Sequence, residues 1–291
     1  MVPGADPETP AYIQNLMNDD GQCPYGIYYM KRTIDRLFRN LSTNMFLFEE
    51  LVKRDFEKKY KRTALGMAWS VLSPMLTLLV MKIVFTRFFG KDTPHYTTYL
   101  FAGNIIMSYY REATNNGMSS LMNNASVITK INIPKYLFVL SQNVSALINF
   151  LLTVVVFFVF ALLDGITLHP RMLMLLYPTL CLIIFNIGVG MILSALFVFF
   201  RDIRYLYSVF LMLLQYLSAI FYTVDRFPAS AQKLFLLNPI YVYIKYFRTI
   251  VISQQIPSPA YHALCAMYAV VLLIIGGVIY KKYNHQFVYY I

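Results

Sequence analysis

The feature that most constrains this chain is a series of apolar runs, each about as long as a membrane is thick. They lie at roughly 65–89, 96–114, 136–163, 171–200, 205–222 and 260–280. A helix of about 20 apolar residues crosses a hydrocarbon core about 30 Å thick. Only 13% of the 291 residues are charged, against about 25% in soluble domains. We therefore expect an all-α integral membrane protein built as a six-transmembrane-helix bundle.

A seventh apolar stretch, Leu234 to Ile252, differs from these runs. Asn238-Pro239 interrupts it, and Lys245 and Arg248 lie in its second half. Proline breaks a helix interior, and a charge at the bilayer centre costs about 2.5–3.5 kcal/mol on insertion scales. The sequence therefore predicts an outer re-entrant helical hairpin at about 228–252 instead of a seventh span.

The positive charges predict the orientation of the spans. Most of the 25 Lys and Arg residues fall on inner segments when both termini are cytoplasmic, as the positive-inside rule requires. This topology places Arg111 beside an inner loop, and a seventh span would put Lys281 and Lys282 outside. The net charge of +11 gathers beside apolar runs, which indicates contact with membrane lipids and excludes a nucleic-acid partner.

A basic amphipathic helix is expected ahead of the first span. Met45, Phe48, Val52, Phe56 and Tyr60 recur at steps of three or four residues, which places them on one helix face. Such a helix usually lies in the membrane interface. Residues 1–43 are predicted to be a cytoplasmic amino-terminal tail, and residues 44–291 the transmembrane domain. The residues that we assign to this amino-terminal interface helix and its junction with the first span are Arg54, Asp55, Lys58, Lys59, Arg62 and Trp69.

The sequence shows no catalytic or metal-binding pattern. There is no GxxxxGK[ST] phosphate loop, so the chain does not bind ATP in that manner. Cys23, Cys181 and Cys265 have no metal-ligand spacing, and the four histidines form no HExxH pattern. We expect no metal and no cofactor in this chain.

Four sequence blocks occur in an informative order. They read RDFEKKYKRTALGMAWSVLSPM from Arg54, ITKINIPKYLFVLS from Ile128, GVGMILSALFVFFRDIRYLYSVFLMLLQYLSAIFY from Gly188 and LNPIYVYIKYFR from Leu237. Together they resemble the ABC-2 permease family, and within it the polysaccharide and teichoic-acid export branch. The resemblance runs from about residue 45 to the end. One departure is Ala219, where that family usually has proline.

The resemblance implies a homodimer that recruits two copies of a separate ATP-binding subunit, which would hold ATP and Mg²⁺. It also implies export of a lipid-linked glycan, such as a teichoic acid, O-antigen or capsule precursor. The location would be the cytoplasmic membrane of a bacterium, with several passes. A path for so large a substrate is expected at the two-fold axis, because one six-helix bundle is too small to enclose it.

The resemblance also places contacts with the ATPase on two inner segments. The first is a short coupling helix in the segment before Pro134, and the second is the turn between the fourth and fifth runs. The residues assigned to ATPase coupling are Asn124, Ala125, Ser126, Val127, Ile128 and Lys130, together with Arg201 and Asp202. The alternatives are a solvated loop for the first segment and a simple helix-end seal for the second.

A substrate path or outer gate is expected from cations and tyrosines near the outer side. Tyr241, Lys245 and Arg248 are spaced by four and three residues, so they share a helix face. We add Lys82, inside the first run, and Tyr222. Aromatic rings suit sugar faces, and cations suit an anionic glycan. The alternatives are snorkelling of Lys82 and an interfacial anchor of tyrosines and cations.

Three other functions are compatible with parts of this pattern. One is an ABC-2 exporter of drugs, peptides or small lipids, which would have a compact pocket. Another is a membrane-embedded enzyme of glycan assembly, which would need catalytic groups at one membrane face. A third is a channel, which would work without an ATPase.

The predicted topology can be tested by labelling of introduced cysteines in intact cells. A Ser230→Cys variant should react with an impermeant thiol reagent from outside, because residues from about 223 to 259 are expected to be external. An Asn284→Cys variant should react only after the membrane is opened. External labelling at position 284 would contradict the six-span arrangement.

Overall fold

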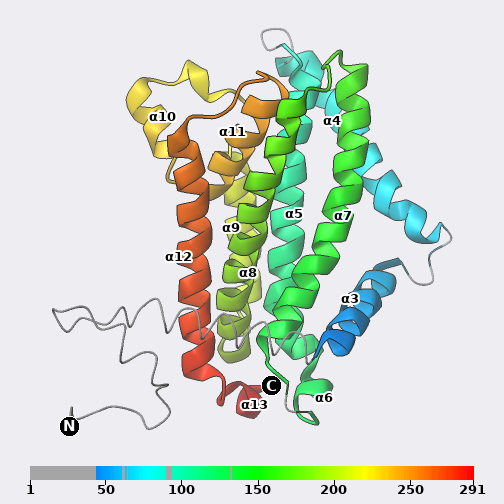
Figure 1. Ribbon diagram of the computed structural model, residues 1–291, viewed down its shortest axis with the longest axis vertical. Coiled ribbons are helices and arrows are strands. Elements are labelled where there is room, and N and C mark those ends of the chain that lie inside the picture. Colours follow the sequence, from blue (N-terminus) through cyan, green and yellow to red (C-terminus); the bar gives the residue numbers. More distant parts are fainter. Residues whose placement is uncertain (1–43, 61–62, 64, 90–93, 132) are drawn as a thin grey trace, which may run out of the picture. The chain divides into compact units, whose positions relative to one another are not determined.

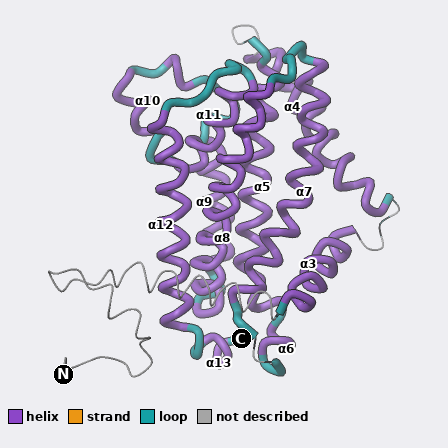
Figure 2. The backbone as a smooth tube through the Cα atoms, viewed as in Figure 1, coloured by secondary structure: helices purple, strands orange, loops and turns teal. Residues whose placement is uncertain are grey.

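The computed structural model describes residues 44–60, 63, 65–89, 94–131 and 133–291, and every regular element in them is a helix (Figures 1 and 2). Residues 47–291 form one compact unit, separate from residues 1–46. The predicted tail and Arg62 lie outside the described residues. The all-helical fold class is confirmed.

The helices follow one another through short connections. The α-helices are α3 (Met45–Tyr60), α4 (Trp69–Phe89), α5 (Tyr96–Asn123), α6 (Ala125–Ile128), α7 (Tyr136–Leu163), α8 (Leu176–Phe199), α9 (Ile203–Leu217), α10 (Ala229–Phe235), α11 (Pro239–Val251), α12 (Pro259–Tyr283) and α13 (Phe287–Tyr290). Short 3₁₀ turns cover Gly66–Ala68, Pro170–Leu175 and Val224–Arg226.

The long helices run alongside one another within the compact unit. α8 packs mainly on α12, and α5 packs mainly on α7 and α8. The short helices α6 and α13 lie at one end, which we call the α6 end, and α10 and α11 lie at the other, the α11 end (Figure 1). Phe199 at the end of α8 packs on Phe287 of α13, so the turn between α8 and α9 is also at the α6 end.

Contacts at the α6 end join segments far apart in sequence. Lys135, just before α7, donates a hydrogen bond from Nζ to Oδ1 of Asn284 over 3.3 Å. Burial lowers the pKa of the Lys135 ammonium, because a charged group loses hydration there. This bond fixes the beginning of α7 to the segment that follows α12.

By length and composition, four helical segments of the described chain are suited to cross a membrane. They are Gly66–Phe85, Tyr136–Leu163, Pro170–Phe199 and Pro259–Tyr283. α5 has 28 residues but carries many polar side chains, and α9 has only 15 residues. The chain is thus a multi-pass membrane protein, and the six-span count stays a prediction.

Two helices differ in extent from the predicted runs. α5 continues to Asn123, past the expected end at 114, so Arg111 lies within a helix and not beside an inner loop. α9 ends at Leu217, earlier than the expected 222. The apolar run does continue to Tyr222, but Ala219 has a φ of 50°, a left-handed conformation that a helix cannot contain.

Glycines allow α8 and α12 to approach closely. A Cβ atom added to Gly188 would lie 2.5 Å from the main-chain carbon of Leu272, and one added to Gly276 would lie 2.9 Å from the carbonyl oxygen of Gly188. Gly277, the next residue, has open space around it. Small residues at such crossings let helix backbones pack directly in membranes.

The close approach predicts different effects for two neighbouring substitutions. Gly276→Ala should destabilise the protein by about 1–3 kcal/mol, the usual cost of overpacking, and should lower the thermal unfolding temperature in detergent. Gly277→Ala is the matched control, since it has the same gain in helix propensity without the clash. Equal unfolding temperatures for the two variants would contradict the packing described here.

Candidate functional site

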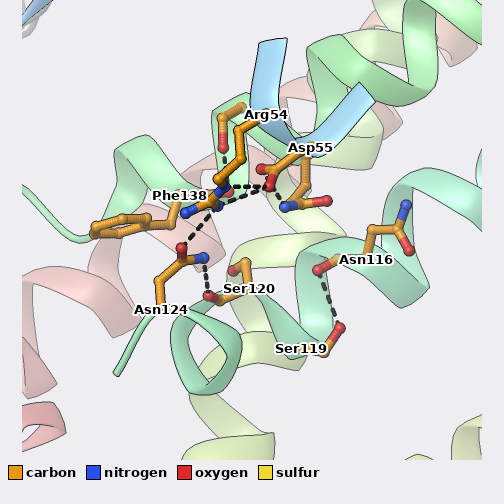
Figure 3. Close-up of polar contacts among 9 residues, drawn as sticks. Arg54, Asp55, Asn116, Ser119, Ser120, Asn124 and Phe138 are labelled. Atoms are coloured by element: carbon orange, nitrogen blue, oxygen red, sulfur yellow. Dashed lines mark hydrogen bonds and ion pairs between the residues drawn. The ribbon is translucent and has the colours of Figure 1, made fainter. Parts of the chain in front are cut away.

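A polar cleft of about 940 Å³ lies between α3 and the neighbouring parts of α5 and α7. Arg54 of α3 donates from Nη2 to Oδ1 of Asn124 over 2.8 Å and pairs with Asp55 at 2.7 Å (Figure 3). Gln142 of α7 donates to the other oxygen of Asp55. The Arg54–Asp55 pair therefore connects α3 to α7 and to the residue that precedes α6.

A second ion pair stands where this cleft meets a smaller cavity. Lys59 Nζ lies 2.8 Å from Oε1 of Glu112, which also accepts a 2.7 Å hydrogen bond from Asn149. Both Lys59 and Glu112 line the cleft and also a cavity of about 390 Å³. The smaller cavity is bounded by polar side chains of α4, α5 and α7, which are Ser70, Ser73, Thr77, Asn104, Ser108, Asn149 and Thr153.

The interface-helix residues thus separate into two groups. Arg54, Asp55, Lys58 and Lys59 all line the cleft. Trp69, at the beginning of α4, lines the smaller cavity and is 38% exposed. The residues that the sequence could not connect to this group are Glu112, Gln142 and Asn149, which come from other helices.

The predicted coupling segment forms the single-turn helix α6. Asn124 is buried and donates from Nδ2 to the carbonyl of Ser120 over 2.7 Å. Ser126 and Lys130 are exposed, Ala125 and Val127 are half-buried, and Ile128 is only 7% exposed. Ile128 therefore packs within the chain, and the side chains most open to a partner are Ser126 and Lys130.

The other predicted coupling residues, Arg201 and Asp202, are exposed in the turn between α8 and α9. The carbonyl of Asp202 accepts hydrogen bonds from the main-chain nitrogens of Tyr205 and Leu206, which starts α9. The structure places both predicted coupling segments at the α6 end, open to the outside of the described chain.

At the α11 end, one arginine joins α11 to α5 and to the segment that follows α9. Arg248 of α11 is 7% exposed. Its guanidinium donates to the carbonyls of Tyr99 at 3.1 Å, Ala219 at 2.9 Å and Ile220 at 3.1 Å, and lies 3.4 Å from the centre of the Tyr99 ring. Gly103 leaves room for it, because an added Cβ would lie 2.7 Å from Nη2.

Two tyrosines of α5 complete this arrangement. Tyr96 donates to the carbonyl of Phe221 at 2.8 Å, and Tyr99 to that of Tyr222 at 2.7 Å. The carbonyls of 219–222 are thus all bound, although the helix that precedes them has ended. Such carbonyls would otherwise be unpaired in a low-dielectric environment, which costs several kcal/mol each.

The Asn238-Pro239 pair starts α11 and does more than break a run. The Asn238 side chain accepts from the main-chain nitrogens of Ile240 and Tyr241, as an N-cap does, and Pro239 occupies the first turn, where it is favoured. Asn238 also donates from Nδ2 to Oγ of Ser218 over 3.0 Å. The cap therefore ties α11 to the end of α9.

Four of the five residues predicted to line the substrate path lie together, and the fifth, Lys82, lies apart from them. Tyr222, Tyr241, Lys245 and Arg248 gather at the α11 end, where Lys245 Nζ lies 5.9 Å from the ring of Tyr241 and 5.6 Å from that of Tyr261. Tyr241 is buried, and Lys245 is half-buried. Lys82 lies apart from them on α4 with an exposed side chain.

Comparison with known proteins matches residues 47–252 to the family model described as ABC-2 type transporter. The chain belongs to the ABC-2 type transporter family. The match begins within α3 and ends just after α11, so it includes the polar cleft, α6 and the bound carbonyls at 219–222. Membership makes the chain a membrane transport subunit.

Curated relatives cover most of the chain. It is 27% identical over 248 residues to the O-antigen export system permease protein RfbA of Klebsiella pneumoniae, covering 83% of this chain and 95% of that protein. A protein of the same name from Myxococcus xanthus is 27% identical over 87% of this chain and 98% of its own length. The capsule polysaccharide export inner-membrane protein CtrC of Neisseria meningitidis is 21% identical over 80% of this chain and 89% of its own.

The contacts of Arg248 and Lys245 predict separate effects for the two residues. Arg248→Gln should lower the yield of folded protein and its thermal unfolding temperature, because a buried carbonyl that loses its partner costs about 1–3 kcal/mol. Lys245→Gln, one turn away and half-buried, should change that temperature little. The unfolding temperature of each variant is measured by size-exclusion chromatography of samples heated to a series of temperatures. An unchanged Arg248→Gln protein would show that the carbonyls at 219–222 do not need the guanidinium.

Proposed function

We propose that this chain is the membrane-spanning subunit of an ATP-driven exporter that moves a lipid-linked cell-surface glycopolymer, such as a polysaccharide or teichoic acid, outward across the cytoplasmic membrane. The observation that carries the proposal is the match over 80–87% of the chain to permeases of O-antigen and capsule polysaccharide export. The match covers nearly the full length of those relatives, so the similarity extends over the whole permease and is not confined to one segment.

ATP and Mg²⁺ would be bound by a separate partner subunit, present in two copies. In support, the α6 end presents two exposed segments, α6 with Ser126 and Lys130, and the turn at Arg201 and Asp202. Arg54 connects the first of these to α3 through Asn124. A displacement of α6 by a partner would therefore be transmitted to α3 and, through the Asp55–Gln142 contact, to α7.

The proposed topology adds α5 and α9 to the four apolar spans. α5 lies against α7 and α8, which are both apolar enough to cross, so it occupies the same depth. α10 and α11 would form the outer re-entrant hairpin. With six spans, the α6 end and both termini are cytoplasmic.

We propose a homodimer because one six-helix bundle is too small to enclose the path of so large a substrate, and α4 and α9 present apolar faces to a second copy or to lipid. On α4 the exposed apolar residues include Leu76, Val80 and Ile83, and on α9 they include Leu206, Val209 and Leu213. The substrate would pass between the two copies. Lys82, Tyr222, Tyr241 and Lys245 are proposed to lie along the path or its outer gate, and Arg248 is proposed to hold that gate in position through the carbonyls at 219–222.

The proposal predicts that negative charge placed on α6 and at the adjoining Lys130 uncouples the transporter. A Ser126→Asp, Lys130→Glu double variant should reduce co-purification of the ATPase subunit by about tenfold, as substitutions at the centre of an interface do, and should reduce polymer at the cell surface per inserted transporter. Both side chains are exposed, so folding should be retained.

Arg171→Glu is the control, a charge reversal at an exposed position of the α11 end. It should leave ATPase association and export unchanged. If the α6 variant keeps the ATPase and exports polymer normally, α6 is not the docking element. If the unmodified chain supports no polymer export with its ATPase, the proposed function is wrong.

A further inference from the structure

α5 carries a polar face along a helix that lies among apolar spans. Asn104, Ser108, Arg111 and Asn115 follow one another at steps of four, three and four residues, so they share one face. None of these four is buried in the described chain. α5 packs on α7 and α8.

Arg111 lies close to the middle of this helix. At about 1.5 Å per residue, it is about 22 Å from the beginning of α5 at Tyr96 and about 18 Å from its end at Asn123. In the proposed topology α5 is a span, and an exposed cation within a span is unfavourable against lipid. The side chain therefore needs water or a polar ligand.

Among the described residues, Arg111 has no counter-ion. One Nη atom donates a short hydrogen bond to the side-chain oxygen of Gln215 on α9, which is a neutral acceptor. The adjacent carboxylate, Glu112, pairs with Lys59 of α3. Within the part of the chain that the structure describes, no carboxylate forms an ion pair with Arg111.

From these observations we propose that Arg111, held by Gln215, is a binding site for a phosphate group of the transported substrate, on a hydrophilic wall formed by the polar face of α5. This inference rests on the proposed function and names the chemistry that one site within the path recognises. A guanidinium presents a planar set of donors that matches phosphate. The phosphate is either part of the lipid linkage or part of the glycan.

The neighbouring groups suit the rest of such a substrate. Asn104 and Ser108 line the cavity of about 390 Å³ together with hydroxyl groups of α4, and amides and hydroxyls hydrogen-bond sugar hydroxyls. On the other side, Arg111 adjoins α9 through Gln215. The wall thus joins a polar cavity, which the Lys59–Glu112 ion pair also lines, to a cation with no carboxylate partner in the described chain.

Trp69 provides a direct test. It is the only tryptophan in the chain and lines the cavity that Ser108 also lines, and Ser108 lies one turn from Arg111 on the same face of α5. The purified full-length chain in dodecyl maltoside is titrated with dodecyl phosphate, which stands for a lipid-linked phosphate, and separately with glucose 1-phosphate, which stands for a phosphate in the glycan. A saturable change of Trp69 fluorescence is expected with at least one of them.

Arg111→Gln should weaken that binding by about tenfold or more, since a hydrogen bond to a charged group is lost. Arg111→Lys should retain most of the affinity, and Lys281→Gln, an exposed cation of α12, should match the unmodified chain. Binding of dodecyl phosphate would indicate a phosphate of the lipid linkage, and binding of glucose 1-phosphate would indicate a phosphate of the glycan. A cooperative thermal unfolding transition checks that each variant is folded. If Arg111→Gln does not fold, Gln215→Leu is used in its place, and it should also weaken phosphate binding.

No saturable change in the unmodified chain, or equal affinity in the unmodified and Arg111→Gln proteins, would overturn the assignment. The titration needs neither the ATPase nor polymer, so its failure would remove phosphate recognition at Arg111 and leave the export proposal standing. Failure of export by the unmodified chain would have the opposite consequence.

Discussion

The arrangement at the α11 end depends on the pairing of main-chain carbonyls where α9 stops. Inside a helix each carbonyl is bound by the helix itself, but the carbonyls of 219–222 follow its end. Arg248, Tyr96 and Tyr99 bind them from α11 and α5. In a membrane, non-helical backbone is tolerated only where protein or water satisfies it. These bonds therefore allow α9 to end early and the chain to turn into α10 and α11.

The same hydrogen bonds also stabilise the left-handed backbone conformation of Ala219. Its φ of 50° lies in a region that proline cannot adopt, because the proline ring fixes φ near −65°. Alanine at a left-handed position is strained by about 1–2 kcal/mol. The bond from Arg248 to the carbonyl of this residue offsets that strain. The local backbone is thus specific to a chain without proline here.

Periodicity and apolar length predict much of the fold. The helical class, the amphipathic α3 and the interruption at Asn238-Pro239 all follow from local patterns. The extent of α5 and α9 does not, because Arg111 and Glu112 suggest a span end until the partners of α5 are known, and because an apolar run does not reveal a left-handed residue. Arg248 shares a periodic face with Lys245, yet its carbonyl partners come from residues 28 to 149 positions away. Such pairings belong to tertiary structure.

The glycine contact between α8 and α12 has a mechanical consequence. Two helices whose backbones touch at Gly188 and Gly276 cannot slide past one another without a steric clash, since packed interiors have little free volume. They would therefore move as one rigid body. α4 is different, because only 11% of the most apolar stretch of Gly66–Phe85 is buried and a polar cavity lies between part of α4 and the helices α5 and α7. α4 is thus the apolar span that packing within one copy restrains least, and in the proposed dimer the second copy would restrain it.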